Sequence, residues 1–159
     1  MGYFNYNKEK DFLICIDSDG CAMDTMNSKH FNSFGPEFVK SYDLEEYRDE
    51  ALEYWNEINL FTGTRGINRF KGLAMAVREM SDRKGIKFDG LEEFENWVET
   101  APQLSNPALL EKCQEKSNEC MERALLWSIH VNLSIVAAQD NDMPFENVKE
   151  AMDELCKDA

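Results

Sequence analysis

The sequence lacks any stretch of about 18 consecutive apolar residues, the length from which a membrane-spanning helix is recognised. Residues 1–10 also lack the apolar core of a secretory signal peptide. The densest apolar stretch, residues 124–138, is interrupted by polar side chains, and this pattern indicates a buried helix. We therefore predict a cytoplasmic protein that does not enter a membrane.

Cysteine pairs are absent as well. The five cysteines form an odd set in which no two have the CxxC spacing. Without an export signal, this pattern favours reduced thiols in the cytoplasm over a disulfide framework. The two histidines, His30 and His130, lie far apart in the sequence, and a structural role is the simpler interpretation of each.

Positive charge is scarce. The chain has 17 Lys and Arg residues against 31 Asp and Glu residues, which gives a formal net charge of −14. Such a chain repels phosphate backbones and anionic lipid headgroups, so we expect no nucleic-acid partner and no membrane binding. A hydrophobic content of 43% over 159 residues is nevertheless enough for one folded domain, or for a small domain with an insertion.

Only one segment has the pattern of a strand. Residues 12–16 form a short apolar run that ends abruptly at Asp17, as a buried central strand does where it opens into a loop. Elsewhere the periodicity is helical, with capping-box patterns at Asp43 and Asp89 and a stop signal at Gly85. The expected helices cover residues 44–60, 66–84, 91–98 and 106–139, the last with room for one break, and a final helix follows Pro144.

The loop after the strand carries the sharpest candidate site. Asp17 and Asp19 lie two residues apart at the carboxyl end of a strand, where open α/β sheets bind ligands. One carboxylate can attack phosphorus while the other transfers a proton, and both can share a hard cation. An EF-hand calcium loop is excluded, because Gly20 stands at the fourth position and Ser28 at the twelfth. An ordinary acidic turn is the remaining alternative.

The strand and the pattern D-x-D-G-x-x-x-D-T at residues 17–25 resemble the first motif of the haloacid dehalogenase superfamily. Residues 144–152 are similar to the segment where such chains re-enter the core after an inserted cap, although Asn147 stands where glycine is common. The resemblance implies an α/β fold, a Rossmann-like core with an inserted all-helical cap. For this chain it implies a predominantly α-helical structure with one core strand. The expected divisions are the core strand and loop at 1–27, the cap at 28–142 and the re-entry helix at 143–159.

The resemblance also implies roles for individual residues. Asp17 would be the nucleophile that forms an aspartyl-phosphate, and Asp19 would be the general acid and then the base. The Asp17 carboxylate and the Asp19 backbone carbonyl would help bind Mg²⁺, which offsets the repulsion between an anionic nucleophile and an anionic phosphate. Family members that displace halide lack the second aspartate, so Asp19 favours phosphoryl or phosphono chemistry. The function that we expect from the resemblance is Mg²⁺-dependent hydrolysis of a small phosphorylated metabolite.

Three further features of the family have no counterpart in the sequence. They are a Ser or Thr after a second strand, a Lys or Arg that holds the phosphate, and a second acidic motif. In the family they follow the re-entry helix, whereas this sequence stops at Ala159. We therefore interpret the 159 residues as an N-terminal fragment that is inactive by itself, and we expect its exposed core strand to be a point of self-association.

A local excess of positive charge lies in residues 65–87, where seven basic residues stand against Glu79 and Asp82. Residues 63–65 also resemble the cap region where related sugar-phosphate mutases place a substrate-facing arginine. We therefore predict that Arg65 and Arg69 bind the substrate. The alternative is a solvated basic face whose side chains pair with acidic neighbours.

Other functions stay open. Phosphonate cleavage and phosphosugar mutation share the first motif within the family, and Lys71 is the candidate for the cap lysine that a phosphonatase requires. Outside the family, the helical region can be read as a non-catalytic module that binds a protein partner.

Overall fold

The computed structural model describes residues 14–138 and 143–157. It divides into two compact units. One unit is Met26–Asn141, and the other contains the described residues 14–25 and 143–157. We predicted a helical insert over residues 28–142, and the compact unit begins two residues before that range and ends one residue before its end.

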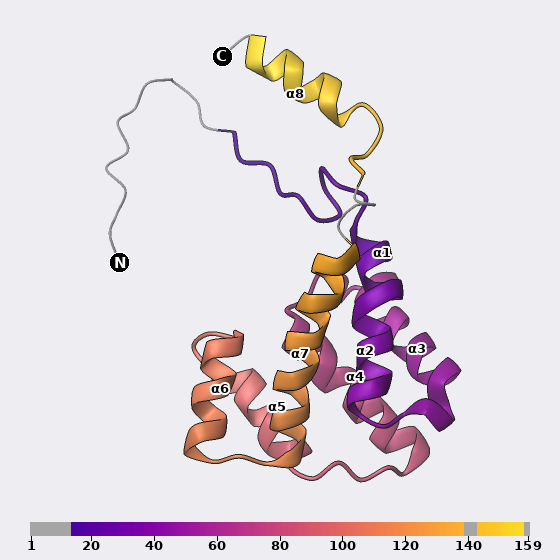
Figure 1. The fold of residues 1–159 in the computed structure, drawn as a ribbon, viewed down its shortest axis with the longest axis vertical. Coiled ribbons are helices and arrows are strands. Elements are labelled where there is room, and N and C mark those ends of the chain that lie inside the picture. The colour runs from indigo at the N-terminus through magenta and orange to yellow at the C-terminus, as the bar shows by residue number, and fades with distance from the viewer. Residues whose placement is uncertain (1–13, 139–142, 158–159) are drawn as a thin grey trace. The chain divides into compact units, whose positions relative to one another are not determined.

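Every regular element in the described part of Met26–Asn141 is a helix (Figure 1). In chain order they are α1 Met26–Lys29, the π-helix η1 His30–Phe34, α2 Gly35–Ser41, the 3₁₀-helix η2 Glu45–Tyr47, α3 Arg48–Asn56, the π-helix η3 Glu57–Phe61, α4 Arg69–Lys84, α5 Leu91–Thr100, α6 Asn106–Glu115 and α7 Glu119–Ala138.

Most predicted helices are present. The range 44–60 corresponds to α3 with the flanking η2 and η3, the range 66–84 to α4, and the range 91–98 to α5. The long region over 106–139 is two helices, α6 and α7, with a break at residues 116–118. The prediction of a predominantly helical chain is confirmed.

The core of this unit is aromatic. Trp55 on α3 and Trp127 on α7 are both 0% exposed, and their ring centroids lie 5.5 Å apart in an edge-on arrangement. Phe34 and Phe38 pack on Trp55 with ring centroids 6.3 and 5.5 Å away. Because α7 also packs against α2, α5 and α6, the buried face of this helix joins the other helices of the unit.

Residues 26–41 correct the predicted plan of four helices in the insert, because they form η1 between α1 and α2. The Gly35-Pro36 pair is typical of a turn. Here Pro36 lies in the first turn of α2, where its missing N–H costs no helical hydrogen bond. A Cβ atom on Gly35 would lie only 2.9 Å from Leu52 Cδ2 and 3.2 Å from Trp55 Cδ1, so glycine lets α2 approach α3 closely.

The predicted helix starts are partly wrong. Asp43 does not cap a helix, since its backbone has a φ of 55° and its carboxylate accepts a 2.7 Å hydrogen bond from Arg123. The N-cap of α5 is Gly90, without a side-chain cap, instead of Asp89. The predicted stop at Gly85 is confirmed, because Gly85 ends α4 with a left-handed φ of 67°.

The second unit contains one described helix, α8 Val148–Lys157, as predicted after Pro144. The predicted core strand is not formed where the structure describes it: Phe12 and Leu13 lie outside the described residues, and Ile14, Cys15 and Ile16 have no strand partner. A strand is stable only when a neighbouring strand satisfies its backbone N–H and C=O groups, and the described residues supply none here. In the part of the chain that the structure describes, every helix is too short or too polar to cross a lipid bilayer.

Candidate functional site

The predicted catalytic residues lie on a tight loop. Gly20 has a φ of 71°, a conformation that costs glycine little, and its N–H donates to the carbonyl of Met23 over 2.9 Å. A second backbone hydrogen bond of 3.2 Å runs from the N–H of Ala22 to the carbonyl of Asp17. Both Asp17 and Asp19 are exposed, so their carboxylates are accessible to solutes.

Thr25 orients one of the two carboxylates. This residue is 1% exposed, and its hydroxyl donates a 2.8 Å hydrogen bond to Asp19 Oδ1. A buried donor with fixed geometry restricts the rotamers of the carboxylate that it binds. Sequence reasoning gave Thr25 no role, although it is the last residue of the D-x-D-G-x-x-x-D-T pattern.

The two segments on which the family resemblance rests lie side by side. The Asp24 N–H donates to the Met143 carbonyl over 2.9 Å, and the Phe145 N–H donates to the Ala22 carbonyl over 3.0 Å. These bonds flank an antiparallel bridge between Met23 and Pro144. The segment that leads into Met26–Asn141 is therefore hydrogen-bonded to the segment that follows it.

Asn147, which stands where glycine is common in the family that the sequence resembles, has an unusual backbone conformation. Its φ is 64°, in the left-handed region that glycine enters freely and asparagine more readily than most other residues. Asn147 precedes α8 and accepts a 3.0 Å hydrogen bond from the Ala151 N–H at its carbonyl. Asn147 thus adopts a backbone conformation that glycine enters more easily than any other residue.

The loop supplies the oxygen donors that Mg²⁺ prefers, namely the Asp17 carboxylate and the backbone carbonyls around it. Within residues 14–138 and 143–157, the structure brings no three His, Cys, Asp or Glu side chains together as a metal site. The donor type therefore fits a hard cation, while the number of acidic ligands is low for octahedral coordination. We expect such a loop to bind Mg²⁺ weakly.

The predicted substrate-binding residues Arg65 and Arg69 belong to Met26–Asn141. Arg65 is exposed, and its Nη1 donates to Asn27 Oδ1 and to the Leu60 carbonyl, both over 3.1 Å. Its two acceptors are neutral. Within the described part of the chain, its positive charge is therefore not neutralised by an acidic side chain.

Arg69 is more enclosed. Its Nη1 donates to Ser128 Oγ over 3.2 Å and to Asn132 Oδ1 over 2.7 Å, and its guanidinium lies 5.1 Å from the centroid of the Phe34 ring. Burial lowers the pKa of Arg69 from its ordinary value. Among the described residues, neither Arg65 nor Arg69 forms an ion pair with an acidic side chain.

Three other basic residues of the segment 65–87 form ion pairs with acidic side chains. Arg78 pairs with Glu95 on α5, as the alternative interpretation of this segment requires. Two more ion pairs join Arg83 to Glu79 and Lys84 to Glu50. The alternative of a basic face that pairs with acidic neighbours thus holds for the C-terminal half of α4 and not for Arg65 and Arg69.

His30 completes what we call the arginine cluster, defined as His30, Arg65 and Arg69. Trp55 Nε1 donates to His30 Nδ1 over 3.1 Å, so a proton on the neutral ring belongs on Nε2. Burial, with a smaller contribution from the positive charges of Arg65 and Arg69, lowers the pKa of His30 to about 4. The histidine is therefore neutral at physiological pH, and the cluster carries its positive charge on the two arginines.

Acidification should destabilise the fold through His30. The unfolded state takes up the proton as the pH falls below 6.5, whereas the folded state does so only near 4, so the free energy of unfolding decreases between these values. At about 1.36 kcal/mol per unit the loss is roughly 3 kcal/mol. Urea denaturation at several pH values across this window measures it.

The matched variant is His30→Gln, which keeps an acceptor for Trp55 Nε1 but cannot titrate. It should lose less stability over the same window than the parent chain, and equal slopes for the two proteins would contradict the assignment. NMR titration of the His30 ring gives a second readout. Since the charge on Arg69 contributes to the low pKa, Arg69→Met should raise the pKa of His30.

Both π-helices lie next to the arginine cluster. His30 is the first residue of η1, and Leu60, whose carbonyl accepts the Arg65 hydrogen bond, belongs to η3. A π-helical turn has weaker local geometry than an α-helical turn and recurs at functional sites.

Comparison of the chain with models of known families, with curated proteins and with solved structures found no significant match. Assignment of a function therefore rests on the residues and geometry of the chain itself.

Proposed function

We propose that the chain carries the nucleophile loop of a Mg²⁺-dependent phosphohydrolase of the haloacid dehalogenase type, acting on a small phosphorylated metabolite. Asp17 attacks phosphorus through a carboxylate oxygen, and the leaving group departs from the opposite side. Asp19 gives the leaving oxygen its proton and later takes a proton from the water that attacks the aspartyl-phosphate. Bound Mg²⁺ supplies charge neutralisation between the Asp17 carboxylate and the phosphoryl oxygens.

The observation that carries this proposal is the pairing of residues 22–24 with residues 143–145. A cap inserted into a core requires its entry and exit segments to meet, and here they share backbone hydrogen bonds of 2.9 and 3.0 Å. The Thr25 hydroxyl bonded to Asp19 supports it further, because a general acid must be held at a defined angle. An ordinary acidic turn does not need either feature.

In the same proposal, Arg65 and Arg69 bind an anionic part of the substrate. These two guanidinium groups have no acidic partner among the residues that the structure describes, and in a chain of net charge −14 they provide the positive potential that an anion requires. Because His30 beside them is neutral at physiological pH, the positive charge of the cluster comes from the two arginines. Such groups position an anion and contribute to substrate binding more than to the chemical step.

Isothermal calorimetry with MgCl₂ tests the loop in the chain itself. We expect weak binding, with a dissociation constant on the order of millimolar, because the loop offers few acidic ligands to a cation that demands octahedral geometry. Asp17→Asn should remove this binding, since the variant replaces a charged oxygen ligand by a neutral amide.

Asp24→Asn is the matched control. Asp24 is an exposed carboxylate of the same loop, so its loss changes the net charge by the same amount without touching the proposed ligands. It should retain Mg²⁺ binding. A micromolar site that survives Asp17→Asn, or a loss of binding that is equal in both variants, would place the metal elsewhere.

A further inference from the structure

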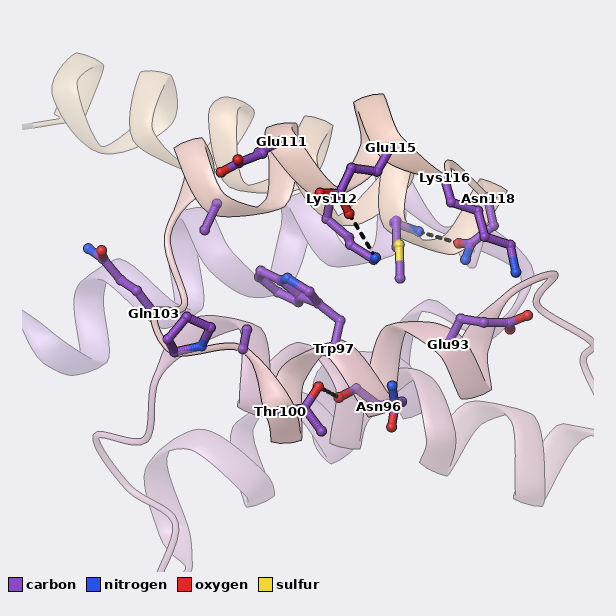
Figure 2. Close-up of a pocket in the computed structure, with 14 residues that line it drawn as sticks. Glu93, Asn96, Trp97, Thr100, Gln103, Glu111, Lys112, Glu115, Lys116 and Asn118 are labelled. Atoms are coloured by element: carbon purple, nitrogen blue, oxygen red, sulfur yellow. Dashed lines mark hydrogen bonds and ion pairs between the residues drawn. The ribbon is translucent and has the colours of Figure 1, made fainter.

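Charged side chains around the groove between α5 and α6 offset one another. The groove has a volume of about 680 Å³, and the Trp97 indole lies between the two helices (Figure 2). On the rim, Lys112 is paired with Glu115 over 3.0 Å. The groove therefore presents both signs of charge together. The arginine cluster differs, because Arg65 and Arg69 have no acidic partner in the part of the chain that the structure describes.

Arg65 and Arg69 are each held by one side of the guanidinium. All four of their hydrogen bonds to neutral acceptors come from Nη1. Among the described residues, no acceptor is bonded to Nε or Nη2 of either arginine. These two nitrogens form the edge that takes a carboxylate side-on, as Arg78 demonstrates: its Nε donates to Glu95 Oε1 over 2.8 Å and its Nη2 donates to Oε2. The cluster thus has two open edges of this kind.

One face of the continuous helix formed by α1 and η1 brings the two arginines to His30. Asn27, His30 and Phe34 are three and four residues apart, a spacing that makes side chains neighbours on a helix. Arg65 bonds to Asn27 at one end of this row, and the Arg69 guanidinium lies 5.1 Å from the Phe34 ring centroid at the other. The rings of Phe34 and His30 stack with centroids 4.7 Å apart. In this row His30 lies between the positions of the two arginines.

His30 contributes a neutral N–H to the row. Because Trp55 Nε1 donates to Nδ1, the proton of the neutral ring is on Nε2, and no described residue accepts a hydrogen bond from it. His30 is 8% exposed, yet Nε2 reaches the solvent, since the one buried side-chain nitrogen or oxygen without a partner among the described residues is Asn56 Oδ1. A pKa of about 4 keeps the ring neutral near pH 7. Nε2 is therefore a donor that a dissolved ligand can reach.

Arg69 stands at a helix end that favours an anion. It is the first residue of the 16-residue helix α4, whose first turn contains no acidic side chain. The positive end of a helix dipole repels a cation, and a bound anion relieves this repulsion. The Ser128 hydroxyl, which is itself bonded to Asn106 Oδ1 over 2.7 Å in a residue that is 0% exposed, holds the guanidinium in place. Arg69 is thus fixed in a position that an anion stabilises.

Two open guanidinium edges and an imidazole N–H exceed what one carboxylate accepts. The Glu95 carboxylate shows that a single arginine edge engages both of its oxygens. A phosphate dianion has three terminal oxygens and two negative charges, so it can accept from both edges and neutralise both arginines. The net charge of −14 opposes long polyanions. The cluster is therefore suited to a single small phosphate group.

We propose that the arginine cluster binds a phosphate dianion through the Nε and Nη2 edges of Arg65 and Arg69 and through the His30 Nε2–H. All these donors belong to Met26–Asn141, so binding requires neither Mg²⁺ nor Asp17. The inference rests on the proposed function, because it names the group that the same arginines bind, and it adds His30 as a residue that determines specificity. The group is a phosphate ester of the substrate or the inorganic phosphate that hydrolysis releases.

Calorimetry with inorganic phosphate, at neutral pH, in EDTA and at constant ionic strength, tests the site. The parent chain should bind with a dissociation constant on the order of 1 mM. Arg65→Met, at an exposed position, should bind about tenfold more weakly, as expected for lost hydrogen bonds to a charged group. Arg83→Met is the matched control, since it removes the same charge from an arginine that is paired with Glu79, and it should bind phosphate unchanged. Acetate should bind about tenfold more weakly than phosphate, because a carboxylate uses only one edge.

Two readouts separate ligand binding by His30 from a structural role. His30→Phe keeps an aromatic ring on Phe34 but has no N–H, and it should weaken phosphate binding about tenfold. His30→Gln can accept from Trp55 and donate to phosphate, so it should restore affinity to within about threefold of the parent chain. In an NMR titration, saturating sulfate, a tetrahedral dianion that keeps both charges in acid, should raise the pKa of His30 from about 4 to about 5 or higher, because a neighbouring anion stabilises the imidazolium.

Phenyl phosphate distinguishes the two sources of the phosphate group. Tighter binding than inorganic phosphate identifies a substrate ester as the occupant, and equal or weaker binding identifies the released product; both support the site. The proposal is overturned if phosphate does not bind, if Arg65→Met and Arg83→Met bind it equally, if acetate binds as tightly, or if sulfate leaves the pKa of His30 unchanged.

Asp17→Asn keeps this test separate from that of the proposed function. The variant should bind phosphate like the parent chain, because Asp17 is not part of the cluster. Loss of phosphate binding in the cluster variants has no bearing on the Mg²⁺ titration of the loop. Conversely, Mg²⁺ binding that does not depend on Asp17 would refute the loop and leave the phosphate site in place.

Discussion

Asp17→Asn should abolish phosphate-ester hydrolysis in any longer chain that joins this sequence to the remaining motifs expected of the family. The substitution removes the nucleophile, so no aspartyl-phosphate can form, and the loss in turnover should reach roughly 10⁴- to 10⁶-fold. The reason is chemical, since an amide oxygen is a poor nucleophile and carries no charge to bind a cation. Steady-state hydrolysis of p-nitrophenyl phosphate with Mg²⁺ measures the effect.

Asp24→Asn again provides the control, because Asp24 lies on the same exposed loop and has no role in the chemistry. Its turnover should stay within a few-fold of the parent protein. The 159-residue chain by itself should show no turnover above background, because none of its motifs matches the phosphate-holding lysine of the family. Steady hydrolysis by this chain that Asp17→Asn leaves intact would refute the assignment of the nucleophile.

The second large effect concerns the aromatic core. Trp127→Ala should destabilise the Met26–Asn141 unit by about 3 to 5 kcal/mol, the range for removal of a fully buried large aromatic side chain. The substitution leaves a cavity beside Trp55 and also deprives the Phe34 carbonyl of its 3.2 Å hydrogen-bond donor. Urea denaturation followed by far-ultraviolet circular dichroism measures the change.

Leu126→Ala is the matched control for this experiment. Leu126 is the neighbouring residue on α7, but its side chain is 52% exposed. Its loss should change the free energy of unfolding by no more than about 0.5 kcal/mol, as is usual for surface positions. If the two variants had the same denaturation midpoint, the burial of Trp127 in a single packed core would be wrong.

Helices with a regular apolar stripe could be predicted from the sequence, whereas the N-terminal caps predicted at Asp43 and Asp89 were wrong. The spacing of Phe70, Ala74, Val77 and Met80 is enough to identify α4, because burial of one face decides whether such a segment is helical. Asp43 has the composition of a cap, but Arg123, 80 residues away, takes its carboxylate. Long-range contacts of this kind leave no local signal.

The helices over residues 26–41 were missed for a related reason. Their Gly35-Pro36 pair has a strong local preference for turns, and what overrides it is the close approach of α2 to α3. The strand prediction for residues 12–16 is wrong for the opposite reason in the part that the structure describes, residues 14–16. Its residues have strand propensity, but a strand depends on a partner, and Ile14 and Ile16 are 58% and 45% exposed without one.

For the candidate site, the sequence identified side chains by type and could not supply their partners. Asp17 and Asp19 were found from the motif, whereas the Thr25 hydroxyl bond to Asp19 depends on how the loop turns. Arg65 and Arg69 were separated from Arg78, Arg83 and Lys84 only by their hydrogen-bond acceptors, which are neutral instead of acidic.

The π-helical turn in η1 also determines the phase of the helix that follows it. An extra residue in an α-helix rotates every later side chain by about 100°, which would carry Phe38 and Val39 out of the core. A π-helical turn absorbs the extra residue and leaves the later part of the helix in phase. The turn in η3 has no such effect, because Thr62 after it is extended. In η1, by contrast, the wider turn keeps Phe38 and Val39, both 0% exposed, on the buried face of α2.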